Sequence, residues 1–385
     1  MKRINSIDFV RGFAMIVMAL DHVREMIHIN SVTQDPTNLQ TTSTILFFTR
    51  WITYLCAPIF VFLAGTSVYL TVKKDGIVTS KNFLLKRGIY LILLEVTVIN
   101  FALFFDISFR TFLFEVIATI GFGFIILSLL LNLSPRVMAI IGLAIISLHN
   151  LAPLIPLEET SVFKTILMPF FSPGAFSVSG KIFIIGYPPI PWLGIMLVGF
   201  ASGTLFELNE EARKKIFTKI GLYALLLFII VRFINIYGDS FPWTVQKNNV
   251  YTFLSFVNVT KYPPSFVFCL LTLGLFFLIL AYAESAKGWG MNILLVYGKV
   301  PLFYFVVHFF LVHVIMLVIM LLQGFHWDEL DFAFGSFGRP KNSESGLPLG
   351  TVYVIWIGVV ASLYKPCLWF GIYKSTCKSW WLKYL

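Results

Sequence analysis

Long apolar runs separated by short polar loops follow one another along the whole chain. A helix needs roughly 20 mostly apolar residues to cross the hydrocarbon core of a bilayer. Ten runs of this kind are present, at 8–28, 45–72, 87–106, 111–132, 136–156, 183–206, 216–237, 264–284, 298–323 and 350–373. The stretch 291–297 is a candidate for a separate interfacial segment. The pattern predicts an all-α polytopic integral membrane protein, with about ten transmembrane helices in one bundle and a single domain over residues 1–385.

Composition supports this class of protein. Of the 385 residues, 58% are hydrophobic and 12% are charged, whereas soluble domains carry roughly 25% charged residues. A net charge of +10 would suggest nucleic acid in a soluble protein. Here the basic residues lie in clusters between apolar runs, with no basic stripe on a polar face, so we expect no nucleic-acid partner. The four cysteines form no CxxC motif, which argues against disulfides and a zinc site.

Lysines and arginines concentrate in alternate loops. Sixteen lie in one set of loops and termini: Lys2, Arg3, Lys73, Lys74, Lys81, Lys86, Arg87, Arg136, Arg213, Lys214, Lys215, Lys219, Lys287, Lys374, Lys378 and Lys383. Seven lie in the other set: Arg110, Lys164, Lys181, Lys247, Lys261, Arg339 and Lys341. Because cytoplasmic loops are enriched in lysine and arginine, this asymmetry predicts that both termini are cytoplasmic.

The first apolar run contains an unusual number of polar side chains. Charged groups inside a span are costly, so they usually face the bundle interior and mark function. At 100° per residue, six side chains of this run share one narrow stripe: Asp8, Arg11, Met15, Met18, His22 and Glu25. Arg11 and His22 are eleven residues apart, which is about 16 Å along a helix. The stripe predicts a polar line along the interior of the bundle.

His22 is the candidate general base of this stripe. A histidine suits that role when a partner orients its ring. Asp21 is about 100° round the helix from His22, so direct pairing is awkward, whereas Glu25, three residues on, is better placed. The alternative is that His22 is a hydrogen-bonded packing residue.

An ordered series of motifs resembles a known family. Arg11 and His22 match the R-x10-H pattern of acyltransferase-3-type membrane enzymes. The fuller strings RINSIDFVRG (3–12) and LDHVR (20–24) resemble bacterial relatives of heparan-α-glucosaminide N-acetyltransferase. Further similar stretches are APIFVFLAGTS (57–67), GYP to WLG (186–194), KYPPS (261–265) and GKVPLFY (298–304), with His308 after it.

This resemblance implies an activity and a location. Members transfer an acyl group, usually acetyl from acetyl-CoA on the cytoplasmic side, to a sugar-type hydroxyl or amine acceptor reached from outside. His22 would be the catalytic base and Arg11 the donor-side cation, in a bacterial plasma (inner) membrane. The animal enzyme has Asn-Tyr where this chain has Asp21-His22, and its working histidine comes later. His28 is therefore a second candidate for the catalytic histidine.

Several further residues are candidates for the site. Lys299 precedes Pro301 at the cytoplasmic start of a span, where a helix N-terminus and an ammonium group could meet phosphate. With Arg87 and Lys86 on the same side, it is a candidate contact to coenzyme A; the alternative is a lysine that only sets membrane orientation. Candidates for the active-site wall are Asp8, Arg50, Tyr304 and His308. His308 and His313 lie on different helix faces, so no metal is expected.

Two similar outer helix starts, Tyr187-Pro188-Pro189 and Tyr262-Pro263-Pro264, could attract an anion or a carbonyl oxygen, although simple helix punctuation explains them too. The competing function is a proton-coupled secondary transporter, with Asp8, Asp21, His22 and Glu95 as a proton relay. Transporters often have duplicated halves, and none are visible here. The acceptor and the oligomeric state stay open; a homo-oligomer is compatible with the sequence.

Overall fold

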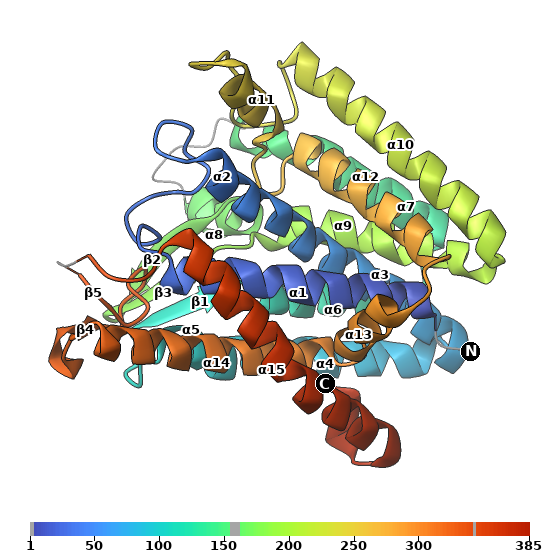
Figure 1. The fold of residues 1–385 in the computed structure, drawn as a ribbon. Helices are drawn as coiled ribbons and strands as arrows, with labels where there is room; N and C mark the ends of the chain where they lie inside the picture. The colour runs from blue at the N-terminus through green and yellow to red at the C-terminus, as the bar shows by residue number, and fades with distance from the viewer. Residues whose placement is uncertain (1–3, 155–161, 342–343) are drawn as a thin grey trace.

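The structure is a computed structural model, and it describes residues 4–154, 162–341 and 344–385. Long helices run side by side in one bundle (Figure 1). Within the described residues, eight helical stretches are long and apolar enough to cross a membrane: Thr44–Asp75, Ile77–Phe104, Pro135–Ala152, Pro189–Glu207, Glu210–Ile234, Phe266–Ala283, Pro301–Leu322 and Leu349–Thr376. The predicted all-α polytopic membrane fold is therefore confirmed.

Two of the ten predicted runs fall outside these eight stretches. They correspond to α1 (Asn5–Ile27), which carries many charges, and to α6 (Val116–Leu130), an apolar helix of 15 residues. With 23 residues, α1 is about 35 Å long, enough to cross a bilayer. The count of ten spans stays a prediction. Residues 155–156 of the fifth run, Lys2, Arg3 and the side chain of Lys164 lie outside what the structure describes.

The first helix lies inside the bundle, and most of its residues are buried. Around it pack α3 (Cys56–Asp75), α12 (Phe266–Ala283), α13 (Trp289–Gly298), α14 (Pro301–Leu322) and α15 (Leu349–Thr376). Glycine lets α1 and α13 touch backbone to backbone. A Cβ added to Gly298 would lie 1.7 Å from the carbonyl oxygen of Asp8, and one on Gly12 would lie 1.9 Å from that of Leu294. This close packing fixes the position of the polar stripe.

The other helices form pairs around this centre. The pair α3 and α9 (Pro189–Ser202) depends on Gly65 and Gly199, where an added Cβ would lie 2.0 Å and 2.1 Å from a backbone carbonyl oxygen of the other helix. Small residues at a helix contact allow this approach. The remaining helices are α2 (Thr44–Trp51), α4 (Ile77–Leu94), α5 (Asn100–Phe104), α7 (Pro135–Leu148), α8 (Val162–Phe171), α10 (Glu210–Ile234) and α11 (Asn249–Val257).

A small sheet caps one end of the bundle (Figure 1). In it, β3 (Lys181–Ile185) pairs in parallel with β1 (Thr111–Phe114), with Thr111 opposite Ile182, and antiparallel with β2 (Gly174–Val178). A second, two-stranded pairing joins β4 (Leu330–Asp331) to β5 (Arg339–Pro340). Because β1 leads into α6 and β3 leads into α9, their parallel pairing brings the N-termini of those two helices to the same place.

The beginnings of two predicted spans are wrong. The runs 111–132 and 183–206 were expected to be helical throughout, but 111–114 and 181–185 are strands, and the helices begin at Val116 and Pro189. Phenylalanine, isoleucine and threonine suit strands, and a short apolar run does not distinguish a strand from a helix. The Tyr187-Pro188-Pro189 start is confirmed. By contrast, Tyr262-Pro263-Pro264 precedes α12, whose N-cap is Ser265, with its side chain accepting from Phe268 N at 3.1 Å.

Both described ends of the chain lie on the side where α1 begins, which we call the terminal face (Figure 1). Tyr384 stacks on Phe83 of α4, with ring centroids 5.7 Å apart. The side where α1 ends, with the sheet, is the opposite face. Residues 291–297 belong to α13, a short helix separate from α14; its interfacial position stays a prediction.

Candidate active site

Two cavities flank the middle of α1. The first, of about 320 Å³ and toward the opposite face, we call the histidine cavity; its polar lining is Asp21, His22, Glu25, Arg50, Thr53, Glu115, Tyr187, Lys261 and Tyr262. The second, of about 520 Å³ and toward the terminal face, we call the basic cavity; its cations are Arg11, Arg87, Lys299 and Lys374. The predicted donor-side and acceptor-side residues of α1 therefore lie in two different spaces.

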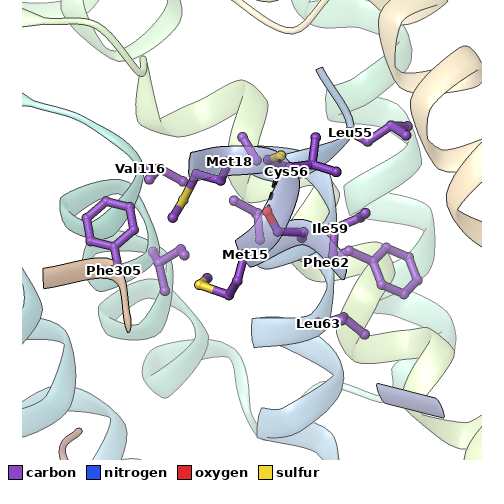
Figure 2. Close-up of a cluster of buried hydrophobic side chains, with 14 of the residues drawn as sticks. Met15, Met18, Leu55, Cys56, Ile59, Phe62, Leu63, Val116 and Phe305 are labelled. Atoms are coloured by element: carbon purple, nitrogen blue, oxygen red, sulfur yellow. Dashed lines mark hydrogen bonds between the residues drawn. The ribbon is translucent and has the colours of Figure 1, made fainter. Parts of the chain in front are cut away.

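Apolar side chains form the boundary between these spaces. Phe60, Val116 and Phe305 line both cavities, while Met15 lines the basic cavity and Met18 the histidine cavity. Figure 2 shows Met15, Met18, Val116 and Phe305 turned toward one another. We call these five residues the apolar junction. A group that moves between the cavities has to pass the apolar junction, whose five side chains are all uncharged.

In the histidine cavity, a buried carboxylate is held between two guanidinium groups. Arg24 donates from Nη2 to Asp21 Oδ1 at 3.0 Å, and Arg50 donates from Nη1 to Asp21 Oδ2. Arg50 also donates to Thr53 Oγ1 at 3.3 Å. Both carboxylate oxygens of Asp21 thus accept hydrogen bonds from arginines, in line with the expectation that it pairs poorly with His22. Its charge anchors α1 to the last turn of α2 and holds Arg50 in the cavity wall.

His22 has a different environment. Its Nδ1 lies 3.7 Å from Glu25 Oε2, too long for a hydrogen bond but within reach of one after a small movement. Its ring packs against the rings of Phe309 and His308, with centroid distances of 4.3 Å and 5.2 Å. Nδ1 has no hydrogen-bond partner among the described residues. Aromatic contacts hold the ring in place beside Glu25, and the residue lines the cavity.

His308 and Tyr304 form a layer behind His22 and do not line the cavity themselves. Both are fully buried, and His308 Nδ1 lies 3.2 Å from the carbonyl oxygen of Tyr304. The Tyr304 hydroxyl and His308 Nε2 lack hydrogen-bond partners in the part of the chain that is described. Their contact with the site therefore runs through the His22 ring.

The rest of the histidine cavity comes from segments distant in the sequence. Glu115 is the residue between β1 and α6, and Tyr187 lies between β3 and α9. The hydroxyls of Tyr187 and Tyr262 are 3.3 Å apart, and Lys261 Nζ lies 4.9 Å from the centre of the Tyr262 ring. Lys261, expected only as a loop lysine, is 7% exposed. The sequence pattern pointed to the two tyrosines but gave no role to Glu115, because the meeting of Glu115 and Tyr187 depends on the β1–β3 pairing.

The basic cavity gathers cations from α1, α4 and α15 and from the turn between α13 and α14. Arg11 donates from Nη2 to Ser67 Oγ at 2.5 Å, and its Nη1 lies 3.5 Å from Asp8. Lys299 is exposed immediately before α14, and Lys374 comes from the last turn of α15. No acidic side chain is among the described residues that line this cavity. Such a space favours an anionic ligand with an apolar arm, since leucines, isoleucines and phenylalanines line the rest.

Besides Tyr304 and His308, three more predicted residues line neither cavity. Asp8 is buried beside Arg11, and Lys86 is exposed in a neighbouring cavity that it shares with Arg87. His28 is the C-cap of α1; its carbonyl oxygen accepts from Arg339 Nη1 at 2.8 Å, and the residue pairs with Leu347. Of the two candidate histidines, His22 is the one that lines a cavity.

The described residues contain no cluster of three or more histidine, cysteine, aspartate or glutamate side chains arranged to hold a metal ion. The arrangement instead offers a histidine with a nearby carboxylate, an apolar passage, and a second space with several cations. Together these suit the transfer of a group from an anionic donor to an acceptor with a removable proton.

Comparison with known proteins adds one positive finding. A family model described as heparan-alpha-glucosaminide N-acetyltransferase, catalytic, matches residues 3–239. The match includes α1 with Arg11 and His22, and also Arg50, Glu115 and Tyr187. It ends before Lys261, Lys299 and His308, so for these residues the resemblance rests on the motifs alone. No curated protein matches the chain.

Proposed function

Because the chain belongs to the heparan-alpha-glucosaminide N-acetyltransferase family and is a multi-pass membrane acetyltransferase, we propose that it moves an acetyl group along α1. Acetyl-CoA is the donor used by such enzymes and would bind in the basic cavity. The acceptor, a sugar-type hydroxyl or amine, would bind in the histidine cavity. The observation that carries this proposal is that the two cavities adjoin at an apolar junction, with Arg11 in one and His22 in the other.

The donor fits the basic cavity by charge and by shape. Coenzyme A carries its phosphates at one end of a long pantetheine arm and its thioester at the other. Phosphates near the terminal face would meet Lys299 and Arg87, and the arm would follow the apolar wall inward. The thioester would then reach Met15 and Phe305 at the apolar junction.

His22 would act as the base. In the direct route, the acceptor's oxygen or nitrogen forms a bond to the acetyl carbonyl carbon while its proton passes to His22. The carbon–sulfur bond breaks, and the coenzyme A thiolate leaves and takes up that proton. Glu25, 3.7 Å away, would orient the imidazole once substrate draws the pair together.

In the second route, His22 carries the acetyl group. Its ring nitrogen attacks the thioester carbonyl carbon, the carbon–sulfur bond breaks, and coenzyme A leaves as the thiol with the N–H proton of the imidazole. The acceptor then takes the acetyl group, and its proton returns to the imidazole. Rapid quenching in the absence of acceptor, followed by mass spectrometry of the protein, separates the routes: an acetylated His22 belongs only to the second.

The distribution of lysine and arginine between the loops supports an assignment of the two faces to the two sides of the membrane. The loops of the terminal face contain the larger share of lysine and arginine, so this face would be cytoplasmic in a bacterial inner membrane. Acetyl-CoA would enter from the cytoplasm, and the acceptor would enter from outside.

Proton-coupled transport is less well supported. The relay proposed for it includes Glu95 and Asp8, and neither lines the histidine cavity or the basic cavity. Glu95 instead accepts a hydrogen bond from the backbone of Ala118. The apolar junction also interrupts a polar path along α1.

The test is acetyl-CoA binding to the purified protein in detergent by calorimetry, followed by thiol release with glucosamine or a hydroxyl sugar as the probe acceptor. We expect micromolar binding and acceptor-dependent release of thiol. A well-folded protein that neither binds acetyl-CoA nor releases thiol with either class of acceptor would overturn the proposal and favour transport.

A further inference from the structure

A third cavity lies at the terminal face, next to the basic cavity. It has a volume of about 530 Å³, and we call it the tail cavity. It is lined by the end of α3, the first turns of α4 and two residues near the end of the chain: Thr71, Asp75, Thr79, Ser80, Asn82, Phe83, Lys86, Arg87, Lys383 and Tyr384. The catalytic chemistry above does not use this cavity, and two of its lining residues, Lys383 and Tyr384, lie beyond the family match, which ends at residue 239.

Arg87 belongs to both cavities. Its guanidinium carbon lies 5.7 Å from the centre of the Phe83 ring and 5.8 Å from that of Phe124. Its Nε is buried and has no hydrogen-bond partner among the described residues, and no ion pair to it is found there. Arg87 is half-buried, and an anion that accepts a hydrogen bond from its Nε would stabilise it.

Two further features of the tail cavity suit a phosphorylated ligand. The Ser80 side chain is 1% exposed, and its hydroxyl has no hydrogen-bond partner in the described part of the chain. Among the lining side chains, the cations Lys86, Arg87 and Lys383 face one carboxylate, Asp75, which itself lies 4.0 Å from Lys74. The cavity is therefore positive overall and contains unused donors.

The C-terminal segment (380–385) completes the wall of both spaces. Trp380–Lys383 form a short helical turn, and Tyr384 packs on Phe83 and Tyr90 of α4. Tyr384 lines the tail cavity, whereas the next residue, Leu385, lines the basic cavity. The segment thus lies beside Arg87, where the two cavities adjoin.

We propose that the tail cavity binds the phosphorylated adenosine end of the acyl-CoA donor, with Arg87 on the diphosphate and Lys383 of the C-terminal segment on the adenosine phosphate. This rests on the proposed function. The donor is then laid out in order: thioester at the apolar junction, pantetheine in the basic cavity, diphosphate at Arg87, adenosine in the tail cavity. The C-terminal segment makes the enzyme select coenzyme A over shorter pantetheine thioesters.

The test compares three ligands on the full chain by calorimetry: acetyl-CoA, acetyl-pantetheine and adenosine 3′,5′-bisphosphate. The variants are Arg87→Ala, Arg87→Lys and Lys383→Ala, with Lys215→Ala as the control. Lys215 is an exposed lysine that pairs with Glu211 at 2.8 Å and lines none of the three cavities. Because Lys383 is also exposed, its variant tests the proposal even where Arg87→Ala disturbs folding.

We expect wild-type protein and Lys215→Ala to bind adenosine 3′,5′-bisphosphate even though it lacks the pantetheine arm, and also to bind acetyl-CoA. Arg87→Ala should weaken acetyl-CoA binding by about ten- to a hundredfold, as befits a lost charge-assisted hydrogen bond, and Arg87→Lys should recover part of it. Lys383→Ala, at a more exposed position, should weaken it by about two- to fivefold. In both alanine variants the ratio of the affinity for acetyl-CoA to that for acetyl-pantetheine should fall.

Two results separate this inference from the proposed function. If wild-type protein binds acetyl-CoA and releases thiol, but the affinity ratio is the same in Arg87→Ala and Lys383→Ala, the tail cavity is not the adenosine site and the acetyltransferase proposal stands. If wild-type protein binds the bisphosphate but no thiol is released with any acceptor, the acetyltransferase proposal falls. If wild-type protein binds neither acetyl-CoA nor the bisphosphate, both fall.

Discussion

The histidine cavity and the basic cavity differ in the charged side chains that line them. In the histidine cavity the protein supplies both signs, and Asp21 is held between Arg24 and Arg50. In the basic cavity the lining side chains include cations and, among the described residues, no carboxylate. The first space is already organised before substrate arrives. The second has an excess of cationic side chains in its lining and favours an anionic ligand, which is the difference expected between a site of chemistry and a site for a charged donor.

Removing the His22 imidazole should produce the largest effect. His22→Ala should lower acetyl transfer by about 10²- to 10⁴-fold, the usual contribution of a general base, while acetyl-CoA binding changes little because the donor contacts lie in the basic cavity. Acceptor-dependent thiol release measures the first and calorimetry the second. His28→Ala is the matched control, since His28 lies beyond the end of α1. Full activity in His22→Ala together with loss in His28→Ala would make His28 the catalytic histidine.

Breaking the arginine–aspartate cluster should mainly affect stability. Asp21→Ala leaves two buried guanidinium groups without their carboxylate and should lower the free energy of unfolding by about 3–5 kcal/mol. Thermal unfolding in detergent measures this. Glu211→Ala, which breaks an exposed pair with Lys215, should change it by less than about 1 kcal/mol.

The Asp21 cluster also gives a coupling test. Arg50→Ala combined with Asp21→Ala should cost less than the sum of the single changes, because the two side chains contact each other. Additive effects would show that Asp21 and Arg50 act independently.

Filling the apolar junction should separate the cavities. Val116→Phe adds bulk where both spaces meet, so acetyl transfer should fall at least about tenfold while acetyl-CoA still binds; overpacking itself costs roughly 1–3 kcal/mol. Val116→Ala is the control for the loss of the isopropyl group. Unchanged transfer in Val116→Phe would mean that the acetyl group does not pass this point.

The smallest effect is expected at Lys299. It is exposed, so Lys299→Ala should weaken acetyl-CoA binding by only about 1.5- to 5-fold, and the difference from wild type should shrink as salt is added. Calorimetry at two salt concentrations, with Lys215→Ala alongside, measures both. An equal loss in Lys215→Ala would assign the effect to general surface charge.

Much of the fold could be read from hydrophobic runs, because a bilayer forces each crossing segment to be long, apolar and helical. The errors occur where that constraint is weaker. Residues 112–114 and 182–185 are apolar yet belong to strands at the end of the bundle, where pairing with each other satisfies their backbone groups. The π-helical turn at Glu95–Ile99 leaves no signal in the hydropathy either.

Part of the candidate site could be predicted from the sequence, because it depends on the local geometry of one helix. The angular stripe on α1 follows from helix geometry, and it identified Arg11 and His22, which line the two cavities. Arg50 was a candidate for the active-site wall, and it lines the histidine cavity. Lys261 and Arg339 look like ordinary loop cations in the sequence, but they are 7% and 2% exposed. Their burial depends on contacts with distant segments, which the local sequence pattern does not reveal.

The sequence by itself determined the membrane class, the helical architecture, the family and the polar line on α1, since each depends on local composition, periodicity or motif. Only the tertiary structure decided that this line is divided by an apolar junction, that Asp21 pairs with arginines, and that Glu115, Tyr187 and Lys261 join His22. It also placed the C-terminal segment beside Arg87. These are contacts between segments tens to hundreds of residues apart, and packing in three dimensions is what selects them.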